Sequence, residues 1–346
     1  MCNIAGYVGE RRAAPILIEM LRAQEALNGG FYTGIATMHE GKIYYRKLVG
    51  SVSRLLEETD AADLPGNIGI IHSRTPGISG DEWAHPFICE RDGEIKTAFV
   101  LNGGIGCFNS YNPKRVKLTE ELMAEGYTMR SREKKNGKQL NLNDDTHVHP
   151  SDVMCQLIGR KIVNGTAADD AMAEAFCETP KEVVALMLSV TEPDAIVWSK
   201  MNYPMFLAFA DHGAYLATAP QAIPNDMNSE PFLLPLLSSG LIRKDSFTCK
   251  PFAAQPAKIA PLSSRLLHDA YEKMCEAMRK EPQSFPMLRN IVVPLFDKAD
   301  CDQANTAIYV VLYDLYRDGR LKIETRYVPG VFEGLLAPAA YFSVTE

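Results

Sequence analysis

The first nine residues of this 346-residue chain, Met1 to Gly9, place a cysteine directly behind the initiator methionine and follow it with an apolar segment. If Met1 is removed, Cys2 carries its thiol beside a free α-amine, whose reference pKa is only about 7.7–8.0. One residue then supplies both a nucleophile and a proton acceptor, as in N-terminal nucleophiles. The segment from Ile4 to Gly9 predicts a buried strand that holds Cys2 in a pocket. The position alone is also compatible with an inert small residue, so the other motifs decide the role of Cys2.

The composition is that of a soluble globular protein, with 46% hydrophobic and 23% charged residues, long enough for one large or two ordinary domains. A net charge of −7 gives no help to binding nucleic acid or an anionic membrane. No run approaches the ~18–20 apolar residues of a spanning helix, and the N-terminus lacks the pattern of a signal peptide. The eight cysteines show no disulfide framework. We therefore expect a cytoplasmic protein with reduced thiols, bound to neither nucleic acid nor membrane.

Hydrophobic periodicity predicts helices and strands in alternating groups along the first 230 residues. The expected helices cover residues 15–28, 118–126, a segment opening at 150, about 167–177 and 180–189. The expected strands cover residues 4–9, 31–37, 42–49, 69–74, 97–101, 127–131, 195–198, 205–210 and 214–218. Ser151 or Asp152 would serve as the N-cap of the helix that opens at Pro150. The pattern predicts an α+β fold in which helices pack against two sheets.

A tract rich in proline and serine, residues 231–240, marks the expected domain boundary. We predict one domain over residues 2–238 and a small, mainly helical C-terminal domain of unknown role over residues 239–346. Helices over 265–280 and 302–318 precede strands over 320–325 and 335–344. A helix followed by a two-stranded wing suggests a winged-helix-like unit, and its near-neutral charge argues against DNA contact.

Two motifs after the opening strand bring polar residues to strand ends. Arg74 ends one short apolar strand, and Asn102-Gly103 follows another, where glycine leaves backbone N–H groups open to a ligand. Each has an ordinary alternative, since Arg74 alone could be a surface arginine and Asn102-Gly103 alone a turn. We expect structural roles for His72 and His85. His147 and His149 lie near acidic residues, but without a second ligand cluster at fitting spacing they predict no metal site.

These motifs occur in the order and rough spacing of the class II glutamine amidotransferases. They are Cys2 with Gly6 and Gly9, His72-x-Arg74, Ala84-His85-Pro86-Phe87, Asn102-Gly103 and the stretch from Phe206 to Pro224. Over about residues 2–235 the chain resembles the glutaminase domains of glucosamine-phosphate synthase and amidophosphoribosyltransferase. The resemblance implies a four-layer αββα N-terminal-nucleophile hydrolase fold that releases ammonia from glutamine without a cofactor.

The resemblance also implies a role for each motif. Cys2 would attack the glutamine amide carbon, and its α-amine would pass the proton to the leaving ammonia. The Asn102 side chain and the Gly103 backbone N–H would form the oxyanion hole, and Arg74 would clamp the substrate α-carboxylate, with Thr75 as a further contact. Asp152 is the candidate for the substrate ammonium, although it could instead cap its helix. A polar excursion displaces the acidic motif, so that Asp144 or Asp145 could replace Asp152.

The chain also departs from the family pattern. Asn28-Gly29-Gly30 stands where an Arg-Gly pair is usual, so that an arginine supporting the nucleophile is absent. Residues 240–346 contain neither a sugar-phosphate isomerase domain nor a phosphoribosyl-diphosphate loop. The leading hypothesis is a glutaminase subunit that supplies ammonia to a separate synthase, with the tail as a docking or lid element. The alternatives are an N-terminal-nucleophile amidohydrolase for another γ-glutamyl or amide substrate, and a catalytically weak glutamine-binding or regulatory module.

Overall fold

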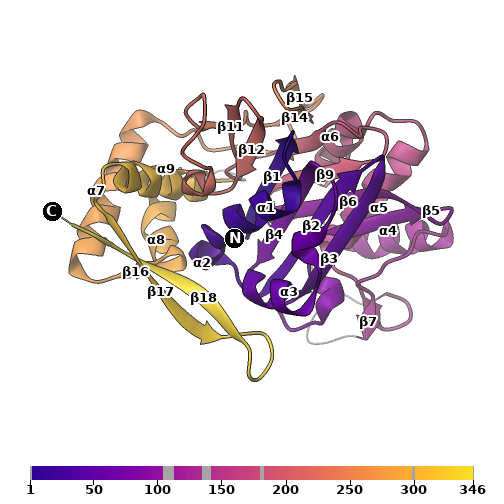
Figure 1. Ribbon diagram of the computed structural model, residues 1–346, viewed down its shortest axis with the longest axis horizontal. Coiled ribbons are helices and arrows are strands. Elements are labelled where there is room, and N and C mark those ends of the chain that lie inside the picture. The colour runs from indigo at the N-terminus through magenta and orange to yellow at the C-terminus, as the bar shows by residue number, and fades with distance from the viewer. Residues whose placement is uncertain (1, 104–112, 135–141, 180–182, 298–300, 346) are drawn as a thin grey trace.

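The computed structural model describes residues 2–103, 113–134, 142–179, 183–297 and 301–345. Two antiparallel sheets lie face to face, and helices cover the outer face of each (Figure 1). Three hydrophobic clusters correspond to these layers: one between the two sheets, one outside the first sheet and one outside the second. A mixed fold with two packed sheets, as the sequence predicts, is therefore confirmed.

The first sheet has seven strands and carries the N-terminal strand near its centre. Their order across the sheet is β13 (Phe232–Leu233), β11 (Phe206–Ala210), β12 (Gly213–Ala217), β1 (Asn3–Gly9), β4 (Ile68–Arg74), β2 (Tyr32–His39) and β3 (Lys42–Val49). All seven residues of β1 are buried, because β12 and β4 flank the strand and both of its faces are covered. The chain start is thereby fixed inside the molecule.

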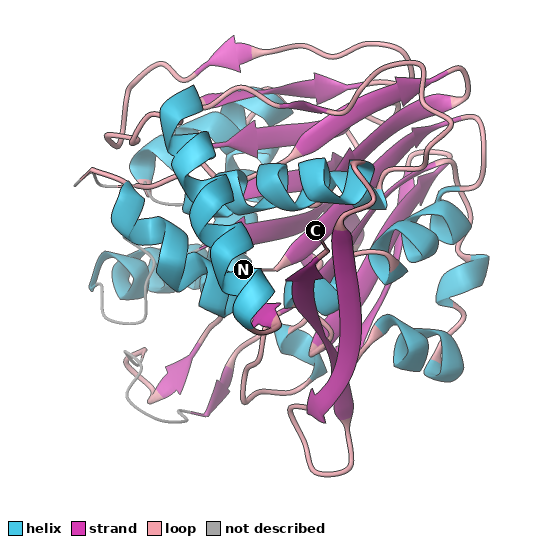
Figure 2. Cartoon of the chain, turned by 90° about the vertical axis from the view of Figure 1, so that its left-hand side faces the viewer, coloured by secondary structure: helices cyan, strands magenta, loops and turns pink. Residues whose placement is uncertain are grey.

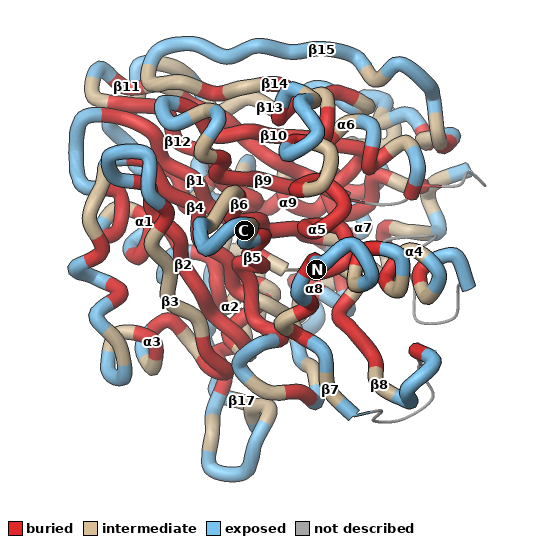
Figure 3. Tube along the Cα trace, turned by 90° about the vertical axis from the view of Figure 1, so that its right-hand side faces the viewer, coloured by how far each residue is buried: buried red, intermediate tan, exposed pale blue. Residues whose placement is uncertain are grey.

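The second sheet has six strands, and its inner face packs on the first sheet. Their order is β15 (Lys250–Pro251), β14 (Ser238–Ile242), β10 (Ile196–Lys200), β9 (Val183–Ser189), β6 (Glu94–Gly103) and β5 (Phe87–Arg91). Figure 3 shows the strands of both sheets as the buried centre of the molecule. The predicted boundary at residue 238 falls at the start of β14, which pairs with β10 in this sheet. The sheet thus extends into the segment predicted as the second domain.

Helices cover the two outer faces. Those beside the first sheet are α1 (Ala13–Arg22), α2 (Glu25–Asn28) and α3 (Val52–Glu58), and those beside the second are α4 (Pro113–Ala124), α5 (Pro150–Val163) and α6 (Ala168–Glu178). A small ribbon of β7 (Glu133–Lys134) and β8 (Thr146–His147) lies before α5. Short 3-10 turns occupy Ala61–Asp63, Asp81–Trp83, Pro220–Ala222 and Val293–Leu295.

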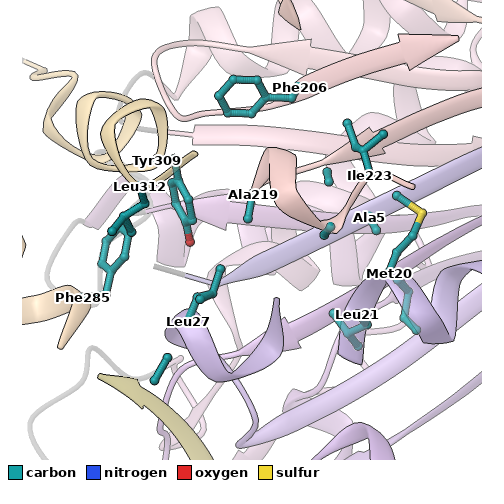
Figure 4. Close-up of a cluster of buried hydrophobic side chains, with 14 of the residues drawn as sticks. Ala5, Met20, Leu21, Leu27, Phe206, Ala219, Ile223, Phe285, Tyr309 and Leu312 are labelled. Carbon is teal, nitrogen blue, oxygen red and sulfur yellow. The ribbon is translucent and has the colours of Figure 1, made fainter. Parts of the chain in front are cut away.

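The C-terminal segment forms three helices and a three-stranded sheet, in the order α7 (Ser264–Lys280), β16 (Gln283–Ser284), α8 (Phe285–Val292), α9 (Ala304–Arg317), β17 (Leu321–Pro329) and β18 (Leu336–Val344). Strand β18 lies between β16 and β17. The helices share one hydrophobic cluster with α1 and the first sheet, in which Phe285, Tyr309 and Leu312 gather near Leu27 (Figure 4). In Figure 2, seen from their side, they stand in front of the sheets. They therefore complete the outer layer of the first sheet.

Three secondary-structure predictions were wrong. Residues 183–189 form the central strand β9 rather than part of a helix over 180–189; both faces of the strand are buried, so its sequence has no alternation. Residues 127–131 form no strand, because the Ser131 backbone N–H donates to the Asp152 carboxylate instead of a neighbouring strand. The predicted helix over 15–28 is two helices, α1 and α2, with a break at residues 23 and 24.

The N-cap of α5 is His149, not Ser151 or Asp152. Its Nδ1 accepts the Ser151 backbone N–H at 3.1 Å, so the cap lies two or three residues before the predicted positions, while the helix begins at Pro150 as expected. Within the described ranges, no helix combines the length and apolar character needed to cross a membrane.

Candidate active site

Cys2 lies at the start of β1, at the end of the first sheet where β4 also ends. Asn3 pairs with Ser73 and Ile4 pairs with His72, so the register brings Cys2 and Arg74 to the same end of two neighbouring strands. Ile4 belongs to the hydrophobic cluster between the sheets, and side chains alternate along a strand, so Cys2 faces this same inner space. The nucleophile candidate thus lies at one end of the layer between the sheets.

Asn102 reaches Cys2 from the second sheet. The Cys2 backbone nitrogen donates to Asn102 Oδ1 at 2.8 Å, and Asn102 Nδ2 donates to the Cys2 carbonyl at 2.6 Å. The Asn102 side chain is completely buried, so this pair of bonds holds the chain start in one orientation. Gly103 follows with a φ of 138°, a conformation that favours glycine. The sequence continues from Gly103 with Gly104-Ile105-Gly106, and these three residues lie outside the described residues.

Arg74 is half-buried at the end of β4 between two aromatic rings. Its guanidinium carbon lies 4.7 Å from the Tyr32 ring centroid and 5.8 Å from that of Trp83. Its Nη1 donates to the Trp83 carbonyl at 3.4 Å, and no carboxylate of the described residues lies within ion-pair distance of it. A guanidinium held by aromatic contacts, without a protein counter-ion, is suited to bind a carboxylate from outside.

The Cys2 thiol lies 3.8 Å from the Thr75 hydroxyl and close to the imidazole of His72. Burial alone would raise the pKa of the Cys2 thiol. The hydrogen bond and charge of His72, then the positive charge of the chain's N-terminus and a backbone hydrogen bond from Thr75, outweigh burial and lower that pKa to about 6. A thiol with such a pKa is mostly thiolate at neutral pH, which is the nucleophilic form.

The acidic candidates do not lie open at this site. Asp152 is completely buried on α5; its Oδ2 accepts from the Ser131 backbone and hydroxyl at 2.9 and 2.7 Å, and its Oδ1 accepts from Gln156 at 3.0 Å. Asp144 pairs with Arg132 and accepts from Thr146, and Asp145 is exposed. The ammonium contact therefore stays a prediction. Asp152 does not cap α5, and its carboxylate instead links the helix to Ser131.

Sequence reasoning missed two neighbours of Cys2. Tyr309 of α9 donates its hydroxyl hydrogen to Asn3 Oδ1 at 3.0 Å, directly behind the nucleophile. His72 was predicted to be structural, although its place two residues before Arg74 on a strand puts both side chains on one face. This spacing could have indicated His72, whereas no local signal could have indicated Tyr309. In the residues that the structure describes, no cluster of three or more His, Cys, Asp or Glu side chains could hold a metal ion.

The chain matches no family model, but it is similar to curated proteins. It is 30% identical over 261 residues to a glutamine–fructose-6-phosphate aminotransferase (isomerizing) of Pyrococcus horikoshii, and 30% identical over 260 residues to that of Chlorobaculum tepidum. Each match covers 72% of this chain but only 38% and 37% of the relative. The chain thus spans less than two fifths of the length of these relatives.

Solved structures share the fold at lower identity. A glutamine phosphoribosylpyrophosphate amidotransferase from B. subtilis superposes with a TM-score of 0.59 at 14% identity, covering 81% of this chain and 58% of that chain. The structure of an allosteric regulatory enzyme of purine biosynthesis superposes with a TM-score of 0.61 at 13% identity, covering 98% and 71%. The resemblance in sequence is thus matched by a resemblance in fold. The chain belongs to the class II glutamine amidotransferase family.

Proposed function

We propose that this protein hydrolyses L-glutamine to glutamate and ammonia through a thioester on Cys2. The observation that carries the proposal is Arg74, a guanidinium at the same strand end as the thiol that has no counter-ion among the described residues. An α-carboxylate held there would present a side-chain amide to the sulfur. The thiolate forms a bond to the amide carbon, Cδ of glutamine, the C–N bond at that carbon breaks, and the nitrogen leaves as ammonia after gaining a proton. Water then cleaves the thioester to give glutamate.

We propose Asn102 and Gly103 as the oxyanion donors. Asn102 Nδ2 already donates to the Cys2 carbonyl, which leaves its second hydrogen for a developing negative charge near the sulfur. Thr75 is proposed as a further substrate contact because its hydroxyl lies beside the thiol. The mechanism needs removal of Met1 to free the Cys2 amine, and it needs no cofactor.

We also propose that the ammonia passes to an acceptor bound by a separate synthase. The curated relatives are named as fructose-6-phosphate aminotransferases, and the match to this chain covers little more than a third of each. The C-terminal segment, in which α9 is followed by the β17 and β18 hairpin, is proposed as a winged-helix-like unit that docks the synthase or covers the site.

Ammonia release from L-glutamine tests this proposal. Methionine-processed protein should release ammonia and glutamate in equal amounts, and Cys2→Ala should release none. Arg74→Lys keeps the positive charge but loses the two-pronged fork, so the KM for glutamine should rise about tenfold or more, a loss of about 1.4 kcal/mol in binding. Arg46→Lys, at an exposed ion pair with Asp60, is the matched control and should leave KM unchanged.

Two alternatives predict different results. An amidohydrolase for other γ-glutamyl or amide substrates would release product from a γ-glutamyl anilide but no ammonia from glutamine. A glutamine-binding module would show no Cys2-dependent ammonia under any condition, yet would bind glutamine in calorimetry. Because Arg74 has no ion-pair partner in the part of the chain that the structure describes, it supports an α-amino acid substrate over a plain amide.

A further inference from the structure

Strand β17 is the free edge of the three-stranded C-terminal sheet. The strand order is β16, β18, β17, so β18 covers one edge of β17, and no other strand in the described ranges pairs with its second edge. Residues 322–327 of β17 are all exposed. The hairpin of β17 and β18 extends outward past the helices (Figure 1). A long exposed edge of this kind is a template to which another strand can be added.

The hydrogen bonds that flank β17 determine which of its residues bond to β18. At one end the Thr345 backbone nitrogen donates to the Arg320 carbonyl at 2.9 Å, and at the other the Gly330 backbone nitrogen donates to the Leu335 carbonyl at 2.8 Å. The register between these two ends is uninterrupted. Successive residues of an antiparallel strand direct their backbone groups to opposite sides. Because Arg320 and Gly330 both have even numbers, the even-numbered residues of β17 bond to β18.

The odd-numbered residues therefore direct their backbone N–H and C=O groups to the free edge. These residues include Ile323, Thr325 and Tyr327. Pro329 is also odd-numbered, which agrees with the rule that proline occurs in an edge strand where its missing N–H would face away from the sheet. The free edge thus offers a run of donors and acceptors centred on Thr325.

The sequence around Thr325 is complementary to itself. If a second β17 lies antiparallel with Thr325 opposite Thr325, then Glu324 lies opposite Arg326 and Ile323 lies opposite Tyr327, each pairing occurring twice about the two-fold axis. Cross-strand pairs of opposite charge and of aromatic with β-branched residues are stabilising. A shift of the register by two residues would instead place Glu324 opposite Glu324 or Arg326 opposite Arg326. The sequence therefore selects one register.

The side chains of β17 are also arranged for this pairing. Ile323 and Tyr327 lie on one face of the strand and are 42% and 70% exposed, so a second copy would cover apolar surface that now contacts water. On the other face, Arg326 Nε donates to Glu324 Oε1 at 2.8 Å, and the guanidinium carbon lies 4.1 Å from the Tyr341 ring centroid. The charged pair is thus already held in place beside the free edge.

We propose that β17 binds β17 of a second copy of this chain, antiparallel and with the two-fold axis at Thr325. Each Thr325 would exchange both of its backbone hydrogen bonds with Thr325 of the second copy, and Ile323 would do the same with Tyr327 of that copy. The two C-terminal sheets would then form one continuous sheet across the dimer. The inference goes beyond the proposed glutamine hydrolysis and uses no residue of the candidate active site.

Sedimentation equilibrium of the full chain tests the proposal directly. We expect the wild type to have the mass of two chains, with dissociation into monomers on dilution from about 100 to 1 µM. Thr325→Pro removes the central outward N–H but no hydrogen bond to β18, so this variant should be monomeric with an unchanged circular dichroism spectrum. Thr325→Val, which keeps the N–H, is its matched control and should remain dimeric. A monomeric wild type, or a dimeric Thr325→Pro protein, would overturn the proposal.

Charge reversal tests the register and does not depend on Thr325→Pro folding. Glu324→Arg alone and Arg326→Glu alone each place like charges opposite one another, so each should weaken the dimer roughly tenfold or more. An equimolar mixture of the two variants restores opposite charges at every pair. Native mass spectrometry should therefore show the mixed dimer in preference to either dimer of like chains, which a defect within one chain could not produce. Glu276→Arg, at the exposed ion pair with Lys280 on α7, is the control and should dimerise like the wild type. A mixture without preference for the mixed dimer would contradict the proposed register.

Discussion

At the scale of single residues, Asn102 has two functions that one substitution can separate. Its amide oxygen orients the Cys2 nitrogen, and its NH2 group is the proposed oxyanion donor. Asn102→Asp keeps the shape and the acceptor but removes the donor. We expect kcat for glutamine to fall about 10²- to 10³-fold with KM changed little. Steady-state kinetics check this, and a loss confined to KM would assign Asn102 to ground-state binding instead.

Asp152 gives a second test at the residue scale. Its carboxylate accepts three protein hydrogen bonds in a buried position, so we expect Asp152→Asn to lower the free energy of unfolding by roughly 1–3 kcal/mol. The KM for glutamine should stay within about twofold of the wild-type value. Urea unfolding and steady-state kinetics measure the two effects separately. A tenfold rise in KM with unchanged stability would instead identify Asp152 as the contact of the substrate ammonium.

At the scale of elements, β10 ends in a lysine buried between the sheets. Lys200 lies in one cross-strand row with Val184 and Asn102, and its Nζ donates to the Leu234 carbonyl at 2.7 Å. Burial lowers the pKa of Lys200 to about 7 from its usual 10.5. Between these pH values the unfolded chain holds a proton that the folded protein has released. The free energy of unfolding therefore rises with pH across this range, by up to about 1.4 kcal/mol per unit.

Lys200→Met removes this titration. The difference in the free energy of unfolding, Lys200→Met minus wild type, should be largest near pH 7. It should fall steadily toward pH 10, because only the wild type gains stability over this range. Urea unfolding of both proteins at pH 7 and pH 9.5 measures the change, with Lys244→Met as the control because the Lys244 side chain is 42% exposed and pairs with Glu10 at the surface. A difference that does not vary with pH would mean that Lys200 stays charged in the folded protein.

The elements also show what sequence patterns can and cannot predict. Strands such as β1, β4 and β6 were predictable, because short apolar runs end at glycines or polar residues that the structure places at strand ends. Strand β9 was not, since a strand buried on both faces has the same apolar run as a helix segment. The strand ends carrying Cys2, Arg74 and Asn102 were therefore predictable. Whether Asp152 binds a ligand or has a structural role was not predictable, because its hydrogen bonds are made with Ser131, 21 positions away in the sequence.

At the scale of the whole molecule, the C-terminal helices form part of the same core as the N-terminal strand. Tyr309 contacts Asn3, 306 positions away in the sequence. A Cβ atom on Gly30 would lie only 2.5 Å from the Cδ of Pro338 in β18, so the two segments are packed closely. The site therefore depends on residues far beyond the region that resembles the family. No periodicity or motif encodes such contacts, so the packing of the tail against the first sheet could not be predicted.

Leu312→Ala tests this dependence. Leu312 is completely buried in the cluster shared by α9, α1 and the first sheet, so its truncation should cost about 2–5 kcal/mol. Both tryptophans, Trp83 and Trp198, lie outside the C-terminal segment, so their fluorescence reports on the rest of the molecule. We expect Leu312→Ala to shift the tryptophan-detected unfolding midpoint together with that of circular dichroism. An unshifted tryptophan transition would mean that the C-terminal segment folds independently.

The central claim is that the thiol of Cys2 forms a covalent bond to the amide carbon, Cδ, of glutamine. Processed protein is mixed with L-glutamine labelled at this carbon, quenched in acid during turnover and digested for peptide mapping. The label should appear on the Cys2 peptide of wild type and be absent from Cys2→Ala. Label on another peptide, or glutamate formed by Cys2→Ala at the wild-type rate, would contradict the claim.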